Sequence, residues 1–323
     1  MRRKPPLWSA DCDDFQPNSL LASRHQHMQD LNNKLGSRIE GGVEGFKFAW
    51  PFPKRPSLFY SFCSSVVLTA VFLASKLLFS FNFNRLTVVN KENLLRLLGD
   101  RSRPLITVAN HRCNLDDPLL WSIFTFREFF ANASIFRYTL AAHNICFTKA
   151  WHTTFFSLGR CVPVVRGAGV YQKGVDYCIE RLAENKWVHL FPEGKVTSEP
   201  IRIKWGVARM IMECPIPPLV VPIWIERMNE VWSSSPPYRP FFNKHVHVTI
   251  GDELDMKECL RNVGANTELE RRKALAEIIQ EHLFALGRKQ ESSFFLGVIA
   301  FSSLSQYETV FESHTTVHPL DDS

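Results

Sequence analysis

The sequence lacks several patterns that would assign it to a large functional class. None of its eight cysteines forms a CxxC pair or has a metal-like spacing to histidine, which argues against a metal site and a secreted disulfide scaffold. No GxSxG turn occurs, so a serine hydrolase is disfavoured. Because the formal charge of +6 is modest and spread along the chain, we expect no nucleic-acid partner, whereas an anionic lipid surface is compatible with it.

Apolar residues are plentiful, with 26 phenylalanines in 323 residues, and one apolar segment dominates. It runs from Ser57 to about Phe83, and the part up to Ser75 carries no charge and is close to the minimum length for a membrane span. Lys76 and several serines dilute it. A transmembrane helix, an interfacial or re-entrant helix and a buried helix all stay open, and flanking aromatic and basic residues favour the interface.

Strands separated by helical segments predict one α/β domain with a mixed, largely buried sheet flanked by helices. We expect a poorly ordered extension over residues 1–45, a membrane-associating segment over 46–83, the α/β domain over 84–288 and a tail of unassigned role over 289–323. Within the domain, Thr267 and Glu270 predict a capping box for a helix that ends at Gly287. Residues 204–225 form a second candidate for membrane contact.

The organising stretch is Asn110-His111-Arg112-Cys113-Asn114-Leu115-Asp116-Asp117-Pro118. It joins a predicted strand over 105–109 to a helix in which Pro118 is the first residue and Asp117 the N-cap. His111 and Asp116 then face each other at the turn, where the carboxylate would fix the imidazole tautomer and leave the other nitrogen as a general base. The alternative is an ordinary hydrogen-bonded loop pair.

Other polar residues also follow predicted strands. Arg166 comes after a strand over 162–165, where a guanidinium suits a phosphate but is equally at home on a surface loop. Glu193, with Gly194 and Lys195, follows a strand over 188–191, and the glycine permits a close backbone approach to a ligand. The run 219–225 is a core strand covered on both faces. His245 and His247 lie on a half-buried strand without a third metal ligand.

Taken in order, these motifs resemble those of the glycerolipid acyltransferases, from about Phe48 to Lys289. The resemblance implies the fold of that superfamily, His111 and Asp116 as catalytic residues, and a lipid headgroup site made by Arg166, Glu193, Gly194 and Lys195. It implies no cofactor and no metal. The remaining motif positions are Asn110, Asp117, Pro118, Gly159, Phe191, Pro192, Val221, Pro222 and Ile223, the last three of which line the acyl site in the family.

Two details resemble a narrower branch, the mitochondrial phospholipid–lysophospholipid transacylases. Asp117-Pro118 extends the motif that contains His111 and Asp116, and Lys195-Val196 replaces the Thr-Arg that usually follows the Phe-Pro-Glu-Gly motif at 191–194. This implies CoA-independent acyl exchange between phospholipids and lysophospholipids, such as cardiolipin and monolysocardiolipin. It also implies peripheral or monotopic placement on mitochondrial inner and outer membranes, facing the intermembrane space. The alternatives are acyl-CoA-dependent acylation of a lysophospholipid or a headgroup amine, and a catalytically silent lipid-binding protein. Monomer and oligomer are both compatible with the sequence.

Overall fold

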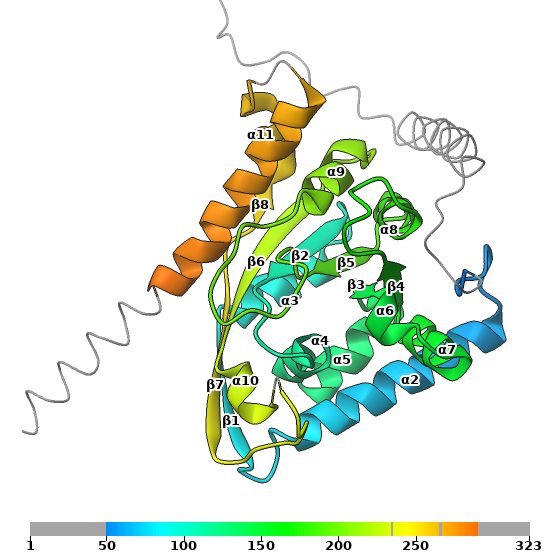
Figure 1. Cartoon of the computed structure of the whole chain (residues 1–323), viewed down its shortest axis with the longest axis vertical. Coiled ribbons are helices and arrows are strands. Elements are labelled where there is room, and N and C mark those ends of the chain that lie inside the picture. The colour runs from blue at the N-terminus through cyan, green and yellow to red at the C-terminus, as the bar shows by residue number, and fades with distance from the viewer. Residues whose placement is uncertain (1–49, 234, 265–266, 290–323) are drawn as a thin grey trace, which may run out of the picture.

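One mixed β-sheet organises the computed structural model, which describes residues 50–233, 235–264 and 267–289 (Figure 1). Its strands are β1 (Asn84–Val89), β2 (Leu105–Ala109), β3 (Tyr138–Ala142), β4 (Cys161–Val164), β5 (Trp187–Leu190), β6 (Leu219–Glu226), β7 (Lys244–Ile250) and β8 (Leu254–Asp255). The α-helices are α2 (Leu58–Leu77), α3 (Lys91–Gly99), α4 (Asp116–Leu120), α5 (Phe126–Asn132), α6 (His143–Cys146), α7 (Ala150–Leu158), α8 (Lys173–Ala183), α9 (Gly206–Glu213), α10 (Met228–Val231), α11 (Met256–Asn262) and a helix over 268–289.

The strand order is β1-β7-β6-β2-β5-β3-β4, with β8 paired to β6. Pairing is parallel from β6 through β2, β5 and β3 to β4, and between β1 and β7, whereas β6 pairs antiparallel with β7 and β8. The predicted mixed sheet is therefore confirmed. The central strand β2 is buried at every residue, as expected for a parallel strand covered on both faces.

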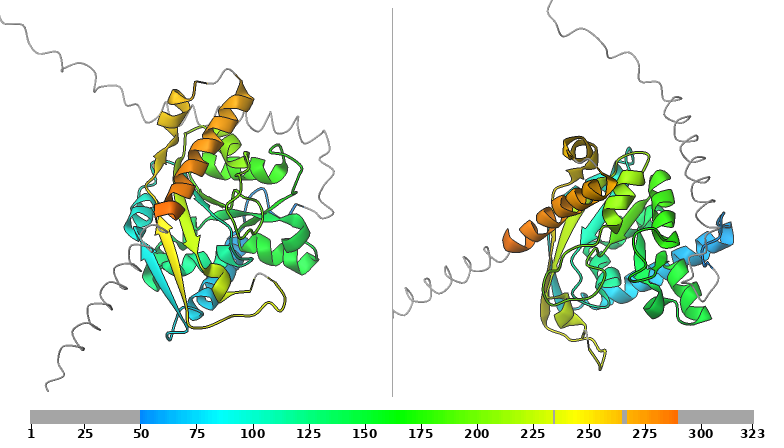
Figure 2. Two further views of the ribbon diagram at one scale, coloured as in Figure 1. Left: turned by 60° about the vertical axis from the view of Figure 1, so that its left-hand side comes forward. Right: turned by 45° about the horizontal axis from the view of Figure 1, so that its top comes forward.

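The two faces of the sheet carry separate apolar cores, because successive side chains of a strand point to opposite sides. In β2, Leu105 and Ala109 join the core under α2, α3, α4 and α5, and Ile106 and Val108 join the core under α8, α9 and the helix over 268–289. Figure 2 shows these helix layers on either side of the sheet.

Helix α2 is the one helix of the described residues that is long and apolar enough to cross a membrane. It nevertheless lies along the domain, with Ser64, Leu68, Phe72 and Ser75 buried on one face. The Phe72 ring stacks on Phe129 of α5 at a centroid distance of 4.0 Å. At the other end of the helix, Lys76 Nζ donates to the carbonyls of Ser122 and Phe124. These contacts hold one side of α2 against protein.

Two predictions for the second half of the chain are wrong. The last described helix does not end at Gly287 but runs to residue 289; Gly287 packs against Trp224, whose ring carbon would lie 2.4 Å from any Cβ placed there. The segment 204–225 does not form an exposed apolar surface, because β6 is the buried strand between β2 and β7. The capping box of Thr267 and Glu270 is confirmed. The predicted extension over 1–45 and nearly all of the predicted tail lie outside the described residues.

Candidate active site

The polar motifs gather at one edge of the sheet. Strands β2, β5, β3 and β4 run parallel, so their carboxyl ends share an edge, and loops at such an edge collect the site residues of open α/β sheets. His111 follows β2, Glu193 follows the adjacent β5, and Arg166 follows β4 at the end of the sheet. Three inter-strand spacings of about 4.8 Å put Arg166 roughly 14 Å from the His111 strand, measured across the sheet.

His111 and Asp116 form the contact that the sequence predicts. Nδ1 of His111 lies 2.9 Å from Oδ2 of Asp116, and the same oxygen accepts the backbone N–H groups of Arg112 at 2.5 Å and Cys113 at 2.8 Å. Asp116 is completely buried, and the His111 side chain is 17 % exposed. The imidazole is therefore fixed through Nδ1, and its other nitrogen is left for a ligand that comes from solvent or membrane.

The electrostatics of Asp116 reflect two opposing causes. Burial raises the pKa of this carboxyl, and the hydrogen bonds from His111 and from the Cys113 and Arg112 amides act in the opposite direction. An N–H of His111 that points at Oδ2 satisfies the carboxylate only if the imidazole carries its proton on Nδ1. The turn therefore selects the tautomer whose Nε2 is a proton acceptor.

Asp117 is not the N-cap of α4, which corrects the prediction. The helix begins two residues earlier than predicted, at Asp116, and Leu115 is its N-cap. The Asp117 carboxylate instead pairs with the buried guanidinium of Arg137, whose Nη1 donates to the Gly159 carbonyl at 3.0 Å. The sequence analysis missed Arg137, because an arginine just before a short strand carries no signal of burial.

Asn110 extends the pairing of β2 with β6 by one residue. Its side-chain amide donates to the Ile225 carbonyl at 2.8 Å, and its side-chain oxygen accepts the Ile225 N–H at 2.7 Å. Asn110 is fully buried. Both ends of its amide are thus used to hold the strand end from which His111 projects.

Glu193 holds the same turn from the side of β5. Its Oε2 accepts the His111 backbone N–H at 3.1 Å and the Thr197 hydroxyl at 3.2 Å. The Thr197 N–H donates to the His111 carbonyl at 3.0 Å, and Arg112 donates to the Thr197 carbonyl. Glu193 is fully buried, and burial raises the pKa of its carboxyl. Phe191 adds a ring stacked on His111 at 4.4 Å.

Gly194 has φ +73°, a conformation in which a side chain is strained. A Cβ there would also lie 2.8 Å from the Nζ of Lys204, so glycine leaves room for this amine beside the loop that follows β5. Lys204 is a second residue that the sequence did not single out, since it entered only as the first residue of the segment 204–225, a candidate for membrane contact. Lys195 and Arg166 are exposed.

Val221, Pro222 and Ile223 are buried in β6, opposite Thr107, Val108 and Ala109 of β2. Val221 and Ile223 belong to the core that also holds Cys113 and Leu119 of the motif turn. Val221 and Ile223 therefore belong to the apolar core on which the His111–Asp116 turn packs. Gly159 lies at the C-terminal end of α7, where its carbonyl is the acceptor for Arg137.

Cys113 is the nearest thiol to His111 in the sequence. Burial raises the pKa of this thiol to about 12, and its Sγ lies 3.5 Å from the Trp232 carbonyl. A thiol that stays protonated and enclosed is a poor nucleophile. The geometry therefore favours a general base without a covalent cysteine intermediate.

A buried polar group lies behind the site. His189 Nδ1 is 2.8 Å from the Thr107 hydroxyl, which also accepts the indole N–H of Trp187 at 2.9 Å. His189 contacts the rings of Trp121 and Phe191. Burial, helped by the charges of Arg137 and His111, lowers the pKa of His189 well below its ordinary value, so this imidazole is neutral in the folded protein.

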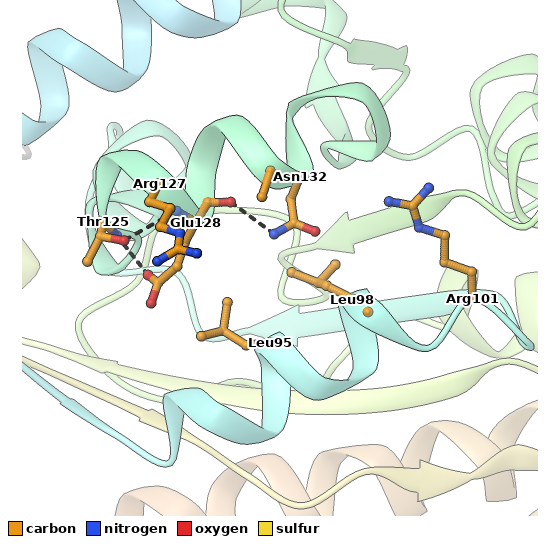
Figure 3. Close-up of a pocket in the computed structure, with 9 residues that line it drawn as sticks. Leu95, Leu98, Arg101, Thr125, Arg127, Glu128 and Asn132 are labelled. Carbon is orange, nitrogen blue, oxygen red and sulfur yellow. Dashed lines mark hydrogen bonds between the residues drawn. The ribbon is translucent and has the colours of Figure 1, made fainter.

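A groove of about 570 Å³ opens between α3 and α5, away from the motifs. Figure 3 shows its lining, with Leu95 and Leu98 on one side and Thr125, Glu128 and Asn132 on the other. The Glu128 carboxylate forms an ion pair with Lys91 and is part of the capping box with Thr125. None of the predicted site residues lines this groove, so we do not assign the active site to it.

We expect Asn110→Ala to reduce stability rather than chemistry. The substitution leaves the N–H and C=O of Ile225 buried without partners, at about 1–3 kcal/mol each, so the free energy of unfolding should fall by roughly 2–6 kcal/mol in urea. Asn262→Ala, at an exposed position, should stay within about 0.5 kcal/mol. An Asn110→Ala protein as stable as the wild type would contradict this role.

His189 should make the protein acid-sensitive. Since its pKa is lowered in the folded state, only the unfolded chain binds this proton below about pH 6.5, and stability falls as the pH falls. Between pH about 7.5 and about 5.5, the unfolding free energy of the wild type should fall by about 1.4 kcal/mol more than that of His189→Gln. Equal losses in the two proteins, measured by urea unfolding, would show that the pKa of His189 is not lowered in the folded state.

Comparisons with known proteins identify relatives of this chain. A family model described as Acyltransferase matches residues 85–226, which include His111, Asp116, Arg166 and Glu193. The protein named Tafazzin from Drosophila melanogaster is 38 % identical over 244 residues, or 73 % of this chain and 64 % of that protein. The protein named Taffazin from Dictyostelium discoideum is 37 % identical over 200 residues, or 60 % of this chain and 70 % of that protein.

A relative with another name matches as well. The N-acylphosphatidylethanolamine synthase of Arabidopsis thaliana is 36 % identical over 182 residues, or 53 % of this chain and 64 % of that protein. The chain thus spans slightly less than two thirds of the Drosophila and Arabidopsis proteins. The Acyltransferase match includes the His111–Asp116 turn and Glu193, which holds that turn. Two tafazzin relatives are more than 35 % identical to the chain. The chain therefore belongs to the tafazzin family of acyltransferases.

Proposed function

We propose that this protein is a CoA-independent phospholipid–lysophospholipid transacylase, with cardiolipin and monolysocardiolipin among its substrates. The observation that carries the proposal is the hydrogen bond between His111 and the buried Asp116 at the end of β2. The names of the tafazzin relatives support it. No cofactor enters the proposed reaction, because the donor lipid carries its own acyl group.

In the proposed reaction, Nε2 of His111 accepts the proton of a free hydroxyl on the lysophospholipid. The hydroxyl oxygen attacks the ester carbonyl of a second phospholipid and forms a tetrahedral intermediate. When the old C–O bond breaks, the imidazolium returns the proton to the departing glycerol oxygen, which gives a new lysophospholipid. Asp116 stabilises the transient imidazolium and keeps its orientation. One ester forms and one breaks, so no net proton is released.

We assign the lipid phosphate to the exposed cations of the same sheet edge, with Arg166 as the main ligand and Lys195 as a second one. A guanidinium binds phosphate oxygens in a bidentate manner. Since Arg166 lies roughly 14 Å across the sheet from the His111 strand, the headgroup would extend along the edge from β2 towards β4. Gly194 stays in the proposed headgroup site as the residue that leaves room for the Lys204 amine at this edge, whereas Glu193 acts mainly by holding the His111 turn.

We propose that the protein associates with the membrane through α2 as an interfacial helix. One face of α2 is packed on the domain, and the other carries exposed Leu58, Phe59, Phe62 and Val66. A helix that is apolar on its free side and fixed to protein on the other suits an interface better than a full span. Family resemblance supports a location on the mitochondrial inner and outer membranes, facing the intermembrane space. The proposed membrane-associating segment covers residues 46–83, and the proposed acyltransferase domain begins at residue 84.

Acylation of a headgroup amine is the second candidate, because the Arabidopsis relative is named N-acylphosphatidylethanolamine synthase. The same base would accept a proton from the amine, and the acyl donor would be a phospholipid or an acyl-CoA. An assay that offers phosphatidylethanolamine beside the lysophospholipid separates the two candidates by product, since one yields an amide and the other an ester.

The proposal predicts that His111→Ala and Asp116→Asn lose activity while they stay folded. A general base supplies about 10² to 10⁴ in rate, so turnover should fall by about that factor. The assay uses liposomes of phosphatidylcholine with a labelled acyl chain plus monolysocardiolipin, first without acyl-CoA and then with it. Label should reach cardiolipin without acyl-CoA in the wild type only.

Controls make the result decisive. Arg271→Ala changes an exposed residue of the helix over 268–289 and should leave turnover unchanged. Transfer that begins only when acyl-CoA is added would overturn CoA independence and leave a conventional acyltransferase. Near-normal turnover in His111→Ala would overturn the mechanism.

A further inference from the structure

We infer that α6 and α7 form a second membrane-contact surface, which seats on an anionic phospholipid bilayer beside α2. This inference rests on the proposed membrane association but not on the proposed chemistry. The surface consists of Ile145, Lys149, Trp151 and Phe155, which we call the α6–α7 patch. Its partner is the bilayer itself, and a second copy of the chain is the competing occupant that the experiment must exclude.

The patch exposes large apolar side chains that a folded domain would otherwise bury. Trp151 is 64 % exposed, Ile145 57 % and Phe155 42 %. Trp151 and Phe155 are four residues apart in α7, so they share one face of the helix. The opposite side of this segment is fixed to the domain by Phe147, which is buried, and by Ser157, which is also buried. The exposed side chains are therefore held outwards by a rigid base.

The charge of this part of the chain fits an anionic surface. No aspartate or glutamate occurs between Glu128 and Asp176, although the chain as a whole carries 32 acidic residues. Lys149 lies at the N-terminal end of α7 and is exposed, as is Arg166 beyond β4. Aromatic and apolar side chains flanked by cations, without acids, are the composition of an interfacial membrane segment.

The patch adjoins α2, which supports the bilayer as its occupant. Ser64 Oγ of α2 donates to the Leu158 carbonyl at 2.7 Å, and Tyr60 Oη donates to the Ser157 carbonyl at 3.2 Å. The two helices lie side by side in Figure 1, and the right-hand view of Figure 2 places both away from the helix over 268–289. A surface that receives α2 would therefore also meet α7.

The same helices lead back to the catalytic turn. The Gly159 carbonyl at the end of α7 accepts Arg137, and Arg137 pairs with Asp117, the neighbour of Asp116. Cys146 of α6 lies close enough to both Asp117 and Arg166 for their charges to act on its thiol. Seating the patch on a bilayer would therefore fix the height of His111 above the lipid headgroups.

The test measures binding of the purified full chain to vesicles by flotation. The vesicles contain phosphatidylcholine alone or phosphatidylcholine with phosphatidylglycerol. The variants are Trp151→Glu/Phe155→Glu and Lys149→Glu, with Leu269→Glu as the matched control, because Leu269 is also an exposed apolar residue but lies on the distant helix. His111→Ala is included so that binding is measured independently of turnover.

We expect the double variant to bind both kinds of vesicle at least about tenfold more weakly, since each large apolar side chain removed from water adds that order of affinity. Lys149→Glu should lose several-fold on the anionic vesicles only. Leu269→Glu and His111→Ala should bind like the wild type. Turnover of the double variant should fall on vesicles and persist on dispersed short-chain phospholipids.

Three results would overturn the inference. One is wild-type vesicle binding by the double variant. Another is a change in its oligomeric state by size-exclusion chromatography with vesicle binding intact, which would make the patch a contact between copies. The third comes from the wild type itself, without any substitution: amide hydrogen exchange over residues 143–158 that is not slowed by vesicles. If the wild type and all variants bind vesicles as expected but none transfers acyl groups, the proposed function is wrong and the membrane-contact inference stands.

Discussion

The buried carboxylate of Asp116 is the constraint on which the active edge depends. A carboxylate removed from water needs donors, and here one oxygen receives the imidazole of His111 and two backbone amides of the intervening turn. These contacts offset part of the cost of burying the carboxylate, whose pKa burial still raises, and the same contacts orient the imidazole.

Every strand that borders the turn contributes to it. Asn110 ties it to β6, and Glu193 ties it to the loop after β5 through His111 and Thr197. Arg137 connects Asp117 to the end of α7. A few motif residues are thus exposed at the sheet edge, whereas a larger number form hydrogen bonds within the protein. This arrangement gives a rigid base below an open sheet edge, as the proposed exchange of acyl groups between two lipids requires.

Much of this could be predicted from sequence, because the strongest signals are local. Apolar runs gave β2 and β6 at their observed positions, and spacing brought His111 to Asp116. Residues whose roles depend on distant partners were missed. Nothing near Arg137 shows that it is buried, and Asp117 looked like a helix cap because its true partner lies twenty residues away. Gly287 resembled a helix end, although its lack of a side chain serves contact with Trp224.

The most direct test of the central claim is the protonation of His111, read by NMR from the two imidazole nitrogens of ¹⁵N-histidine protein, with His111→Ala used for assignment. We expect the ring to carry a proton on Nδ1 and none on Nε2, and we expect Asp116→Asn to abolish this preference. A ring protonated on Nε2 in the wild type would rule out His111 as the base, because no free nitrogen would then face the substrate hydroxyl.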